Sequence, residues 1–273
     1  VLIISNVAFA VAAIYLYRLA LLDHNKGLAI NSVLLMSIFP TAYFLHTGYT
    51  ESLFLALAIP SFYFARKGNW AMAGMLGMVS SLVRITSVAL FFGLLVEYLH
   101  QKKFKLKSIR KDIILLGLIP LGFSIYILIN YHIFGNPLAF IESQSSYFSR
   151  AVAPFWEGLK NALQSVTSRS PNESLMIGYG ESVAGIIGLI AAIFAFRYLR
   201  PSYAIYMLVA LVIVTLNSFW LGTPRYLLSM FPLFILMAKM ADKNQALKFF
   251  FISVSLTLFT LLLSLFVRGW WAF

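Results

Sequence analysis

The stretch from Ile113 to Phe134, IILLGLIPLGFSIYILINYHIF, contains no Asp, Glu, Lys or Arg and is long enough to cross a bilayer as a helix. The stretch from Phe249 to Val267, FFFISVSLTLFTLLLSLFV, has the same character. Hydrophobic residues make up 61% of the 273 and charged residues 11%, whereas soluble domains are about half apolar and a quarter charged. Because a helix satisfies its own backbone hydrogen bonds in lipid, these runs predict an all-α integral membrane protein.

Apolar runs of this kind recur from end to end, so we expect one integral-membrane domain over residues 1–273 with no separate soluble domain. The fold class that follows is a polytopic transmembrane helical bundle with about ten membrane segments, some of them short or broken. The predicted segments are Val1 to Leu21, Leu28 to Leu45, Ser52 to Ala65, Trp70 to Val83, Ser87 to Leu99, Ile113 to Phe134, Met176 to Phe196, Tyr203 to Trp220, Leu227 to Met240 and Phe249 to Val267.

The stretch from Trp70 to Leu99 fits either one long helix or two short helices that meet at Arg84. Basic residues flank it on both sides, at Arg66-Lys67 and in the run HQKKFKLKSIRK from His100 to Lys111. Short loops rich in Lys and Arg remain in the cytoplasm, so both ends of the stretch belong there. Two short helices satisfy this condition, and they place most of the 21 Lys and Arg residues on the cytoplasmic side.

This topology assigns a small set of polar segments to the outer face. Val1 also starts outside, although no signal peptide precedes it, so we expect that the chain is truncated and that a further crossing precedes it. The outer segments are His46 to Glu51, Arg84, the loop from Gly135 to Leu175, Leu221 to Tyr226, and the tail from Arg268 to Phe273.

The net charge of +12 does not indicate nucleic-acid binding, because the basic residues lie in short loops and form no continuous basic surface. The expected partners are membrane lipids, including anionic lipids at the run from Lys102 to Lys111. The chain has no cysteine, no glycine-rich phosphate loop and no His-Glu-x-x-His or Gly-x-Ser-x-Gly motif. We therefore predict no metal site.

The outer segments carry the candidate functional residues. His46 and Glu51 are candidate catalytic groups, because an imidazole or a carboxylate can take a proton from a sugar hydroxyl, and Tyr49 lies between them. The alternative for Glu51 is a structural role in the first turn of a helix capped by Thr50.

Two arginines near the same boundary are candidate substrate-binding residues, and Tyr226 follows the second. A guanidinium group suits a phosphate, and an unpaired charge at the membrane boundary is costly. Arg84 and Arg225 would therefore bind an anionic ligand, with snorkelling to lipid headgroups as the alternative.

The loop from Gly135 to Leu175 supplies three further candidate substrate-binding residues, Gln144, Tyr147 and Arg150. Within it, apolar side chains recur at helical spacing and predict an amphipathic helix that lies in the membrane interface. The apolar residues of this helix are Phe155, Trp156, Leu159, Leu163 and Val166.

Four segments of the chain combine into one pattern: SIFPTAYFLHTGYTESLFLAL (Ser37 to Leu57), YFARKGNWAMAGMLGMVSSLVRITSVAL (Tyr63 to Leu90), NYHIFGNPLAFIESQSSYFSR (Asn130 to Arg150) and PRYLLSMFPLFILMA (Pro224 to Ala238). The first two contain a Phe-Pro pair, then Tyr-Thr-Glu-Ser-Leu-Phe, then a Gly-rich stretch that ends in an arginine. These segments resemble the Pig-V type of mannosyltransferase and its prokaryotic relatives, a family that shows a Phe-Pro pair, then Tyr-Ser/Thr-Glu-Ser-Leu-Phe, then a Gly-rich helix that ends in an arginine.

The resemblance implies a GT-C glycosyltransferase with its active site on the outer or luminal face. Such an enzyme moves a hexose, here mannose, from a polyprenyl-phosphate sugar to a hydroxyl of a lipid-linked glycan, glycolipid or protein. The family carries its catalytic acid in the first outer loop, which would precede Val1. The implied location is the cytoplasmic membrane of a bacterium or archaeon, or the endoplasmic reticulum membrane of a eukaryote. The alternatives are a secondary transporter or lipid flippase, which would also use broken helices, and a noncatalytic assembly subunit.

Overall fold

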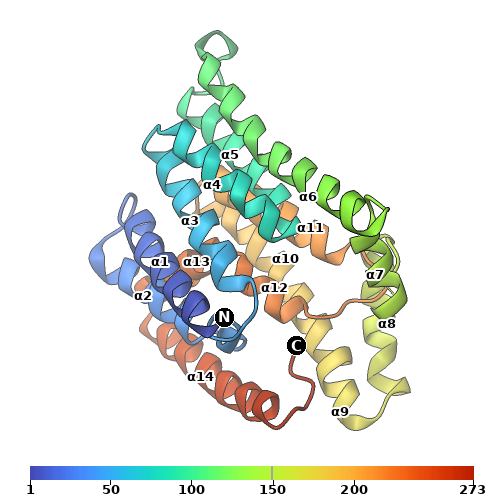
Figure 1. Cartoon of the computed structure of the whole chain (residues 1–273). Helices are drawn as coiled ribbons and strands as arrows, with labels where there is room; N and C mark the ends of the chain where they lie inside the picture. The colour runs from blue at the N-terminus through green and yellow to red at the C-terminus, as the bar shows by residue number, and fades with distance from the viewer. Residues whose placement is uncertain (149) are drawn as a thin grey trace.

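The computed structural model describes residues 1–148 and 150–273, and this part of the chain is all-α (Figure 1). One isolated antiparallel bridge joins Val152 to Asn217. The elements in chain order are α1 (Leu2–Ala20), α2 (Lys26–Ser37), the 3-10 helix η1 (Ala42–Leu45), α3 (Glu51–Arg66), α4 (Trp70–Val83), η2 (Ile85–Ser87), α5 (Val88–Gln101), η3 (Leu106–Ser108), η4 (Lys111–Gly117), α6 (Leu118–Phe134), α7 (Ala139–Phe148), α8 (Phe155–Ser168), α9 (Pro171–Glu173), the π-helix η5 (Ser174–Gly180), α10 (Glu181–Tyr198), α11 (Pro201–Thr215), α12 (Thr223–Ser229), α13 (Pro232–Lys243) and α14 (Gln245–Val267).

In the described part of the chain, four helices are long and apolar enough to cross a membrane. They are α1, the continuous helix Lys111–Phe134, the continuous helix Ser174–Tyr198, and α14. Several other predicted segments form apolar helices of 10–17 residues, including α2, α4 and α11. The sequence therefore predicted the apolar helices correctly, but fewer of them are full-length spans than the ten predicted segments would require.

The predicted break in the stretch from Trp70 to Leu99 is confirmed. Helix α4 ends at Val83, and Arg84 has extended backbone angles (φ −149°, ψ 142°) before η2 and α5 begin. Arg84 thus separates the two short helices, and it lies where α4 ends and shortly before α5 begins.

Two other predicted segments are broken as well. The sequence predicts a proline interruption in the first of them, at Phe39-Pro40, whereas no break was expected in the second. The segment from Leu28 to Leu45 is interrupted at Phe39-Pro40, between α2 and η1. The segment from Leu227 to Met240 is interrupted at Met230-Phe231, and Pro232 then begins α13. Proline lacks an N–H group and clashes with the preceding turn, so each helix stops before it and a new one starts.

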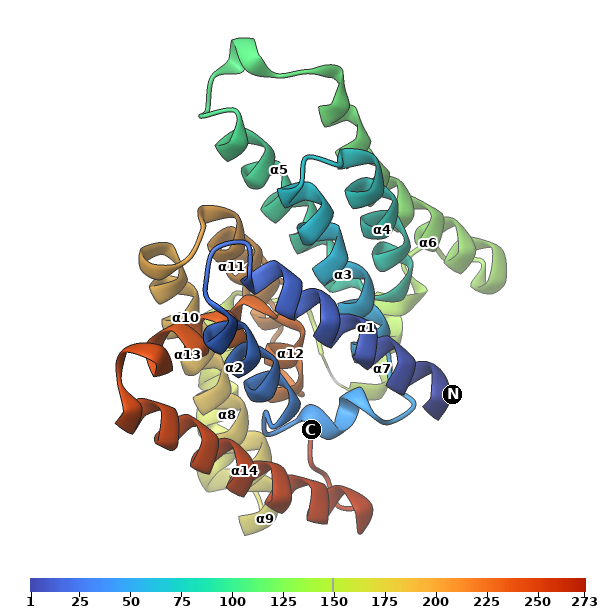
Figure 2. The same ribbon diagram turned by 90° about the vertical axis from the view of Figure 1, so that its left-hand side faces the viewer.

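The helices pack as neighbours in a continuous series. Helix α3 lies between α1 and α4, α4 packs on α6, α5 packs on α11, and α13 packs on α2 and α14 (Figure 2). Both views place the loop between α5 and η4 at one end of the molecule and α14 toward the other.

Small residues allow α4 to approach α6 closely. A Cβ atom at Gly122 would lie 2.3 Å from the Met78 carbonyl oxygen, and one at Gly74 would lie 2.2 Å from the Leu115 carbonyl oxygen. Helices in lipid associate largely through such backbone contact. The Gly-rich character of α4 is therefore explained by packing.

An aromatic cluster joins α3, α11 and the α12–α13 break. The ring of Phe62 lies 5.5 Å from that of Tyr206 and 5.3 Å from that of Phe231, and all three side chains are fully buried. The hydroxyl of Tyr206 donates to the Ser229 carbonyl at 2.8 Å, so its polar end is satisfied. This core fixes the position of α12, which carries two of the predicted site residues, Arg225 and Tyr226.

Candidate functional site

Three charged residues that are far apart in the sequence meet at one end of α3. Glu51 begins α3, Arg84 lies in the α4–α5 break, and Arg225 lies in the first turn of α12. Both guanidinium groups donate to the same carboxylate oxygen, Glu51 Oε1. Together with Tyr49 and Tyr226, these residues form what we call the Glu51 cluster.

Aromatic rings surround the two arginines of the cluster. The guanidinium carbon of Arg225 lies 4.2 Å from the Tyr49 ring centroid and 4.5 Å from that of Phe44. The guanidinium carbon of Arg84 lies 5.3 Å from the Tyr226 ring centroid. These are cation–π distances, so the rings hold the cations in place without neutralising their charge.

The cluster carries more positive than negative charge. The Glu51 side chain is fully buried, and those of Arg84 and Arg225 are 10% and 23% exposed. Glu51 Oε2 has no hydrogen-bond partner among the described residues. One carboxylate thus faces two guanidinium groups, and the partly accessible Arg225 retains capacity to bind an anion.

Glu181 is a functional-site neighbour that the sequence reasoning missed. Its buried carboxylate accepts hydrogen bonds from the backbone N–H groups of Gly222 and of Thr223, the latter at 2.8 Å. Gly222 has φ +83°, which favours glycine, and it precedes α12. Glu181 therefore anchors the turn that orients Arg225, and an acid inside the apolar run from Met176 to Phe196 was the available signal.

His46 lies apart from the Glu51 cluster. Its Nδ1 is 2.9 Å from Asn6 Oδ1, and its ring packs edge-on against Phe9 at 4.7 Å between centroids. Partial burial lowers the pKa of His46 below its ordinary value. The two predicted catalytic candidates, Glu51 and His46, are therefore not in contact.

Gln144 and Arg150 pair with each other, away from Glu51. Arg150 is buried, and it donates to Gln144 Oε1 at 3.1 Å and to the carbonyl oxygens of Phe219 at 3.1 Å and Leu221 at 3.2 Å. The Arg150 guanidinium is thus hydrogen-bonded to the chain segment that leads to Gly222. Arg150 therefore stabilises the backbone of this segment, and its hydrogen bonds go to protein groups.

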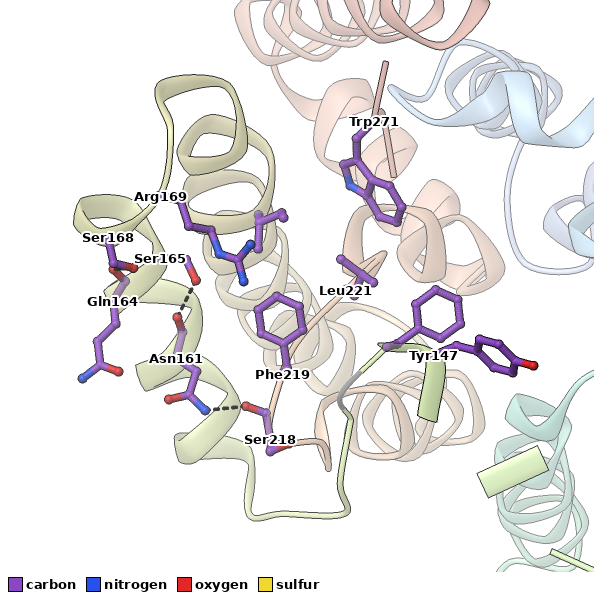
Figure 3. Close-up of a pocket in the computed structure, with 12 residues that line it drawn as sticks. Tyr147, Asn161, Gln164, Ser165, Ser168, Arg169, Ser218, Phe219, Leu221 and Trp271 are labelled. Carbon is purple, nitrogen blue, oxygen red and sulfur yellow. Dashed lines mark hydrogen bonds between the residues drawn. The ribbon is translucent and has the colours of Figure 1, made fainter. Parts of the chain in front are cut away.

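Tyr147 is 82% exposed. It lies at the edge of a cavity between α8 and the segment from Ser218 to Leu221, and its hydroxyl points away from that cavity (Figure 3). The predicted amphipathic helix is α8. Its small residues Gly158 and Ala162 are buried against the protein, whereas Phe155, Trp156 and Leu163 are exposed. The large apolar side chains of α8 thus lie on the outer surface of the protein and do not pack in its core.

A second ionic network lies at the opposite end of α3. Arg66, which ends α3, donates two hydrogen bonds to Asp23 at 2.6 and 2.7 Å. The buried carboxylate of Glu97 accepts from Arg200 at 2.9 Å and from Ser202 at 2.6 Å. From the sequence, Arg66 and Arg200 counted only as basic residues of cytoplasmic loops, and no role was predicted for Asp23, Glu97 or Ser202.

The comparisons with known proteins give one partial relative. Over 82 residues the chain is 34% identical to the GPI mannosyltransferase 2 of Yarrowia lipolytica (strain CLIB 122 / E 150). The match covers 30% of this chain and 23% of that protein. No protein-family model matches the chain, and no solved structure matches it. The chain is therefore similar, over less than a third of its length, to a GPI mannosyltransferase.

Proposed function

We propose that the protein is a multi-pass membrane glycosyltransferase of the Pig-V type. It transfers a hexose, most simply mannose, from a polyprenyl-phosphate sugar to a hydroxyl group of an acceptor glycan, glycolipid or protein. The active site lies at the end of the bundle that carries the Glu51 cluster, on the extracytoplasmic face. Support comes from the partial similarity to a mannosyltransferase and from the charge arrangement of this cluster.

The observation that carries the proposal is the pair of arginines on one carboxylate oxygen. The cluster holds two positively charged guanidinium groups and one negatively charged carboxylate, so one further anion would balance its charge. Arg225, whose side chain is 23% exposed, is the group that such an anion can reach. A lipid phosphate at a membrane boundary supplies that anion, and its apolar chain remains in the bilayer beside the helices.

In this proposal the two arginines stabilise the negative charge of the leaving phosphate. In the transfer step, the bond between the anomeric carbon and the phosphate oxygen breaks, and a bond to the acceptor oxygen forms. The electron pair goes to the phosphate, while the acceptor proton goes to a base. Arg84 and Arg225 stabilise the negative charge that develops on the departing phosphate.

Glu51 acts in this proposal as a positioning residue. A carboxylate oxygen that accepts from two guanidinium groups is poorly suited to take a proton. Its charge instead holds both arginines at the ends of α4 and α12. Tyr49 and Tyr226 restrict the same guanidinium groups through their ring faces.

The test is sugar transfer by purified full-length protein supplied with labelled polyprenyl-phosphate mannose and a glycolipid acceptor. Arg84→Gln and Arg225→Gln are each expected to lower the transfer rate about 100-fold or more, the loss typical of one charge-stabilising donor. Arg268→Gln is the matched control, because Arg268 is exposed and lies outside the cluster. Wild-type rates in both cluster variants would refute the site.

A further inference from the structure

A cavity of about 620 Å³ lies between the end of α7, α8, η5, the segment from Ser218 to Leu221 and Trp271 of the C-terminal tail (Figure 3). Its volume falls within the range of about 300–1,000 Å³ that is usual for small-molecule sites. None of the residues proposed above to stabilise the leaving phosphate lines it, so it has no role yet.

The walls of this cavity are fixed by close contacts. A Cβ atom at Gly158 would lie 2.3 Å from the Asn217 carbonyl oxygen, so α8 packs directly on the chain segment that forms the opposite wall. Asn161 Nδ2 donates to the Ser218 carbonyl at 2.6 Å across the same contact. A site with both walls held in this way binds a ligand without an ordering cost.

The lining combines aromatic rings with uncharged polar groups and one cation. Phe219 and Trp271 present rings to the cavity, and the Arg169 guanidinium lies 5.3 Å from the Phe219 ring centroid (Figure 3). Arg169 makes no ion pair with the described carboxylates. Five uncharged polar residues also line the cavity, three of which already donate a hydrogen bond to a backbone carbonyl: Asn161, Ser165 and Ser168 donate, and Gln164 and Ser218 are the other two.

This chemistry matches a carbohydrate better than a lipid chain or a simple anion. A sugar ring has C–H faces that pack on aromatic rings and hydroxyl groups that donate and accept hydrogen bonds. A lipid chain would remove the Gln164 amide and the Arg169 guanidinium from water without giving them a hydrogen-bonding partner, which is costly. A simple anion would leave the rings of Phe219 and Trp271 without a role.

Two segments of the cavity wall are connected to the elements that carry the Glu51 cluster. Leu221 lines the cavity and immediately precedes the turn at Gly222 that leads to Arg225. Trp271 lines it as well, and the next residue, Ala272, accepts a hydrogen bond from the hydroxyl of Tyr43 in η1. A ligand in the cavity is thus held by the same segments that position the cluster.

We infer that this cavity binds the carbohydrate end of the acceptor, while the Glu51 cluster binds the phosphate of the donor. The inference rests on the proposed function, and it adds the class of acceptor and its place in the molecule. Arg169, Phe219 and Trp271 are the specificity-determining residues, because they supply the cation and the two rings that face the ligand.

The test is direct sugar binding by the purified protein in lipid nanodiscs, measured by saturation-transfer NMR with mannobiose, maltose and chitobiose. At least one disaccharide is expected to bind the wild type. Trp271→Leu and Arg169→Ala should each weaken that binding about tenfold, which corresponds to the loss of one good contact. Trp270→Leu is the matched control, since Trp270 is an exposed neighbour in the same tail that does not line the cavity.

The binding assay tests the acceptor cavity, and the transfer assay tests the site at the Glu51 cluster, so the two proposals can fail separately. If no disaccharide binds, or if Trp271→Leu and Trp270→Leu bind alike, the acceptor cavity is refuted even when transfer is detected. If sugar binds and Trp271→Leu abolishes binding, the cavity stands even when the Arg84 and Arg225 variants show that the transfer site is wrong. In the transfer assay, cavity variants should raise the KM for the acceptor and leave the KM for the donor unchanged.

Discussion

Glu51 shows how one buried charge can determine the arrangement of several elements. Its fully buried carboxylate is the shared partner of Arg84 and Arg225. Replacing it by an uncharged isostere leaves two guanidinium groups without their anion, and breaking a buried ion pair costs about 3–5 kcal/mol. We expect Glu51→Gln to lower the free energy of unfolding by about 3 kcal/mol, measured by SDS titration in mixed micelles. Glu142→Gln, at an exposed position on α7, should change it by less than about 0.5 kcal/mol.

Asp23 gives a prediction with a defined pH window. Burial raises the pKa of Asp23, but the hydrogen bonds and positive charge of Arg66 outweigh it and hold the pKa below its ordinary value of 3.8. The folded state is therefore stabilised above pH 3.8, and this contribution is lost as the pH falls through the lowered value. Wild type should melt above Asp23→Asn at pH 6, and the gap between their melting temperatures should close below about pH 4. A constant gap down to pH 3 would contradict the ion pair.

Single residues were predictable where a rare polar side chain interrupts an apolar sequence. Glu51, Arg84 and Arg225 were identified in this way, and the structure places them in contact. The fact that both arginines bind the same oxygen of Glu51 was not predictable, because it depends on the packing of α12 against α3. Glu97 and Arg200 were missed as a pair for the same reason: they lie 103 residues apart, and only the contact of α5 with α11 joins them.

At the scale of elements, the crossing of α4 and α6 depends on one glycine. A Cβ atom at Gly122 would lie 2.3 Å from a backbone oxygen of α4, so a methyl group there must push the two helices apart. Overpacking of this kind costs about 1–3 kcal/mol. We expect Gly122→Ala to destabilise the protein by this amount in SDS titration. Gly117→Ala in the same continuous helix is the control, because no heavy atom lies within 4 Å of its Cβ position, and equal stability of the two variants would contradict the crossing.

Element boundaries were predictable where charge or proline determines them. Loop charge required two helices over the stretch from Trp70 to Leu99, and the break occurs at Arg84 as expected. Pro40 marked the interruption of its segment in the sequence, whereas the break before Pro232 was not expected, because that proline lies inside a run that is apolar on both sides. The helix α8 was predicted with its large apolar side chains turned toward the membrane interface, but the packing of its small residues Gly158 and Ala162 against the protein was not predicted.

At the scale of the whole molecule, the two ionic groups mark the two ends of the bundle. Glu51 begins α3 and Arg66 ends it, so the Glu51 cluster and the Asp23–Arg66 pair are separated by the length of a 16-residue helix, about 24 Å. This is the separation expected for groups at the two surfaces of a membrane of about 30 Å. From the positive-inside rule we predict that the Arg66 end faces the cytoplasm and the Glu51 end faces outward.

The absence of cysteine allows this sidedness to be measured directly, because one introduced thiol is then the only one in the chain. Tyr147→Cys replaces an 82% exposed residue of α7, and Lys105→Cys replaces an exposed residue of the basic loop after α5. In intact cells, a membrane-impermeant maleimide should label Tyr147→Cys at once and Lys105→Cys only after permeabilisation. The opposite pattern would place the Glu51 cluster on the cytoplasmic side. A donor site that faces outward would then be excluded, because both arginines of the cluster would face the cytoplasm.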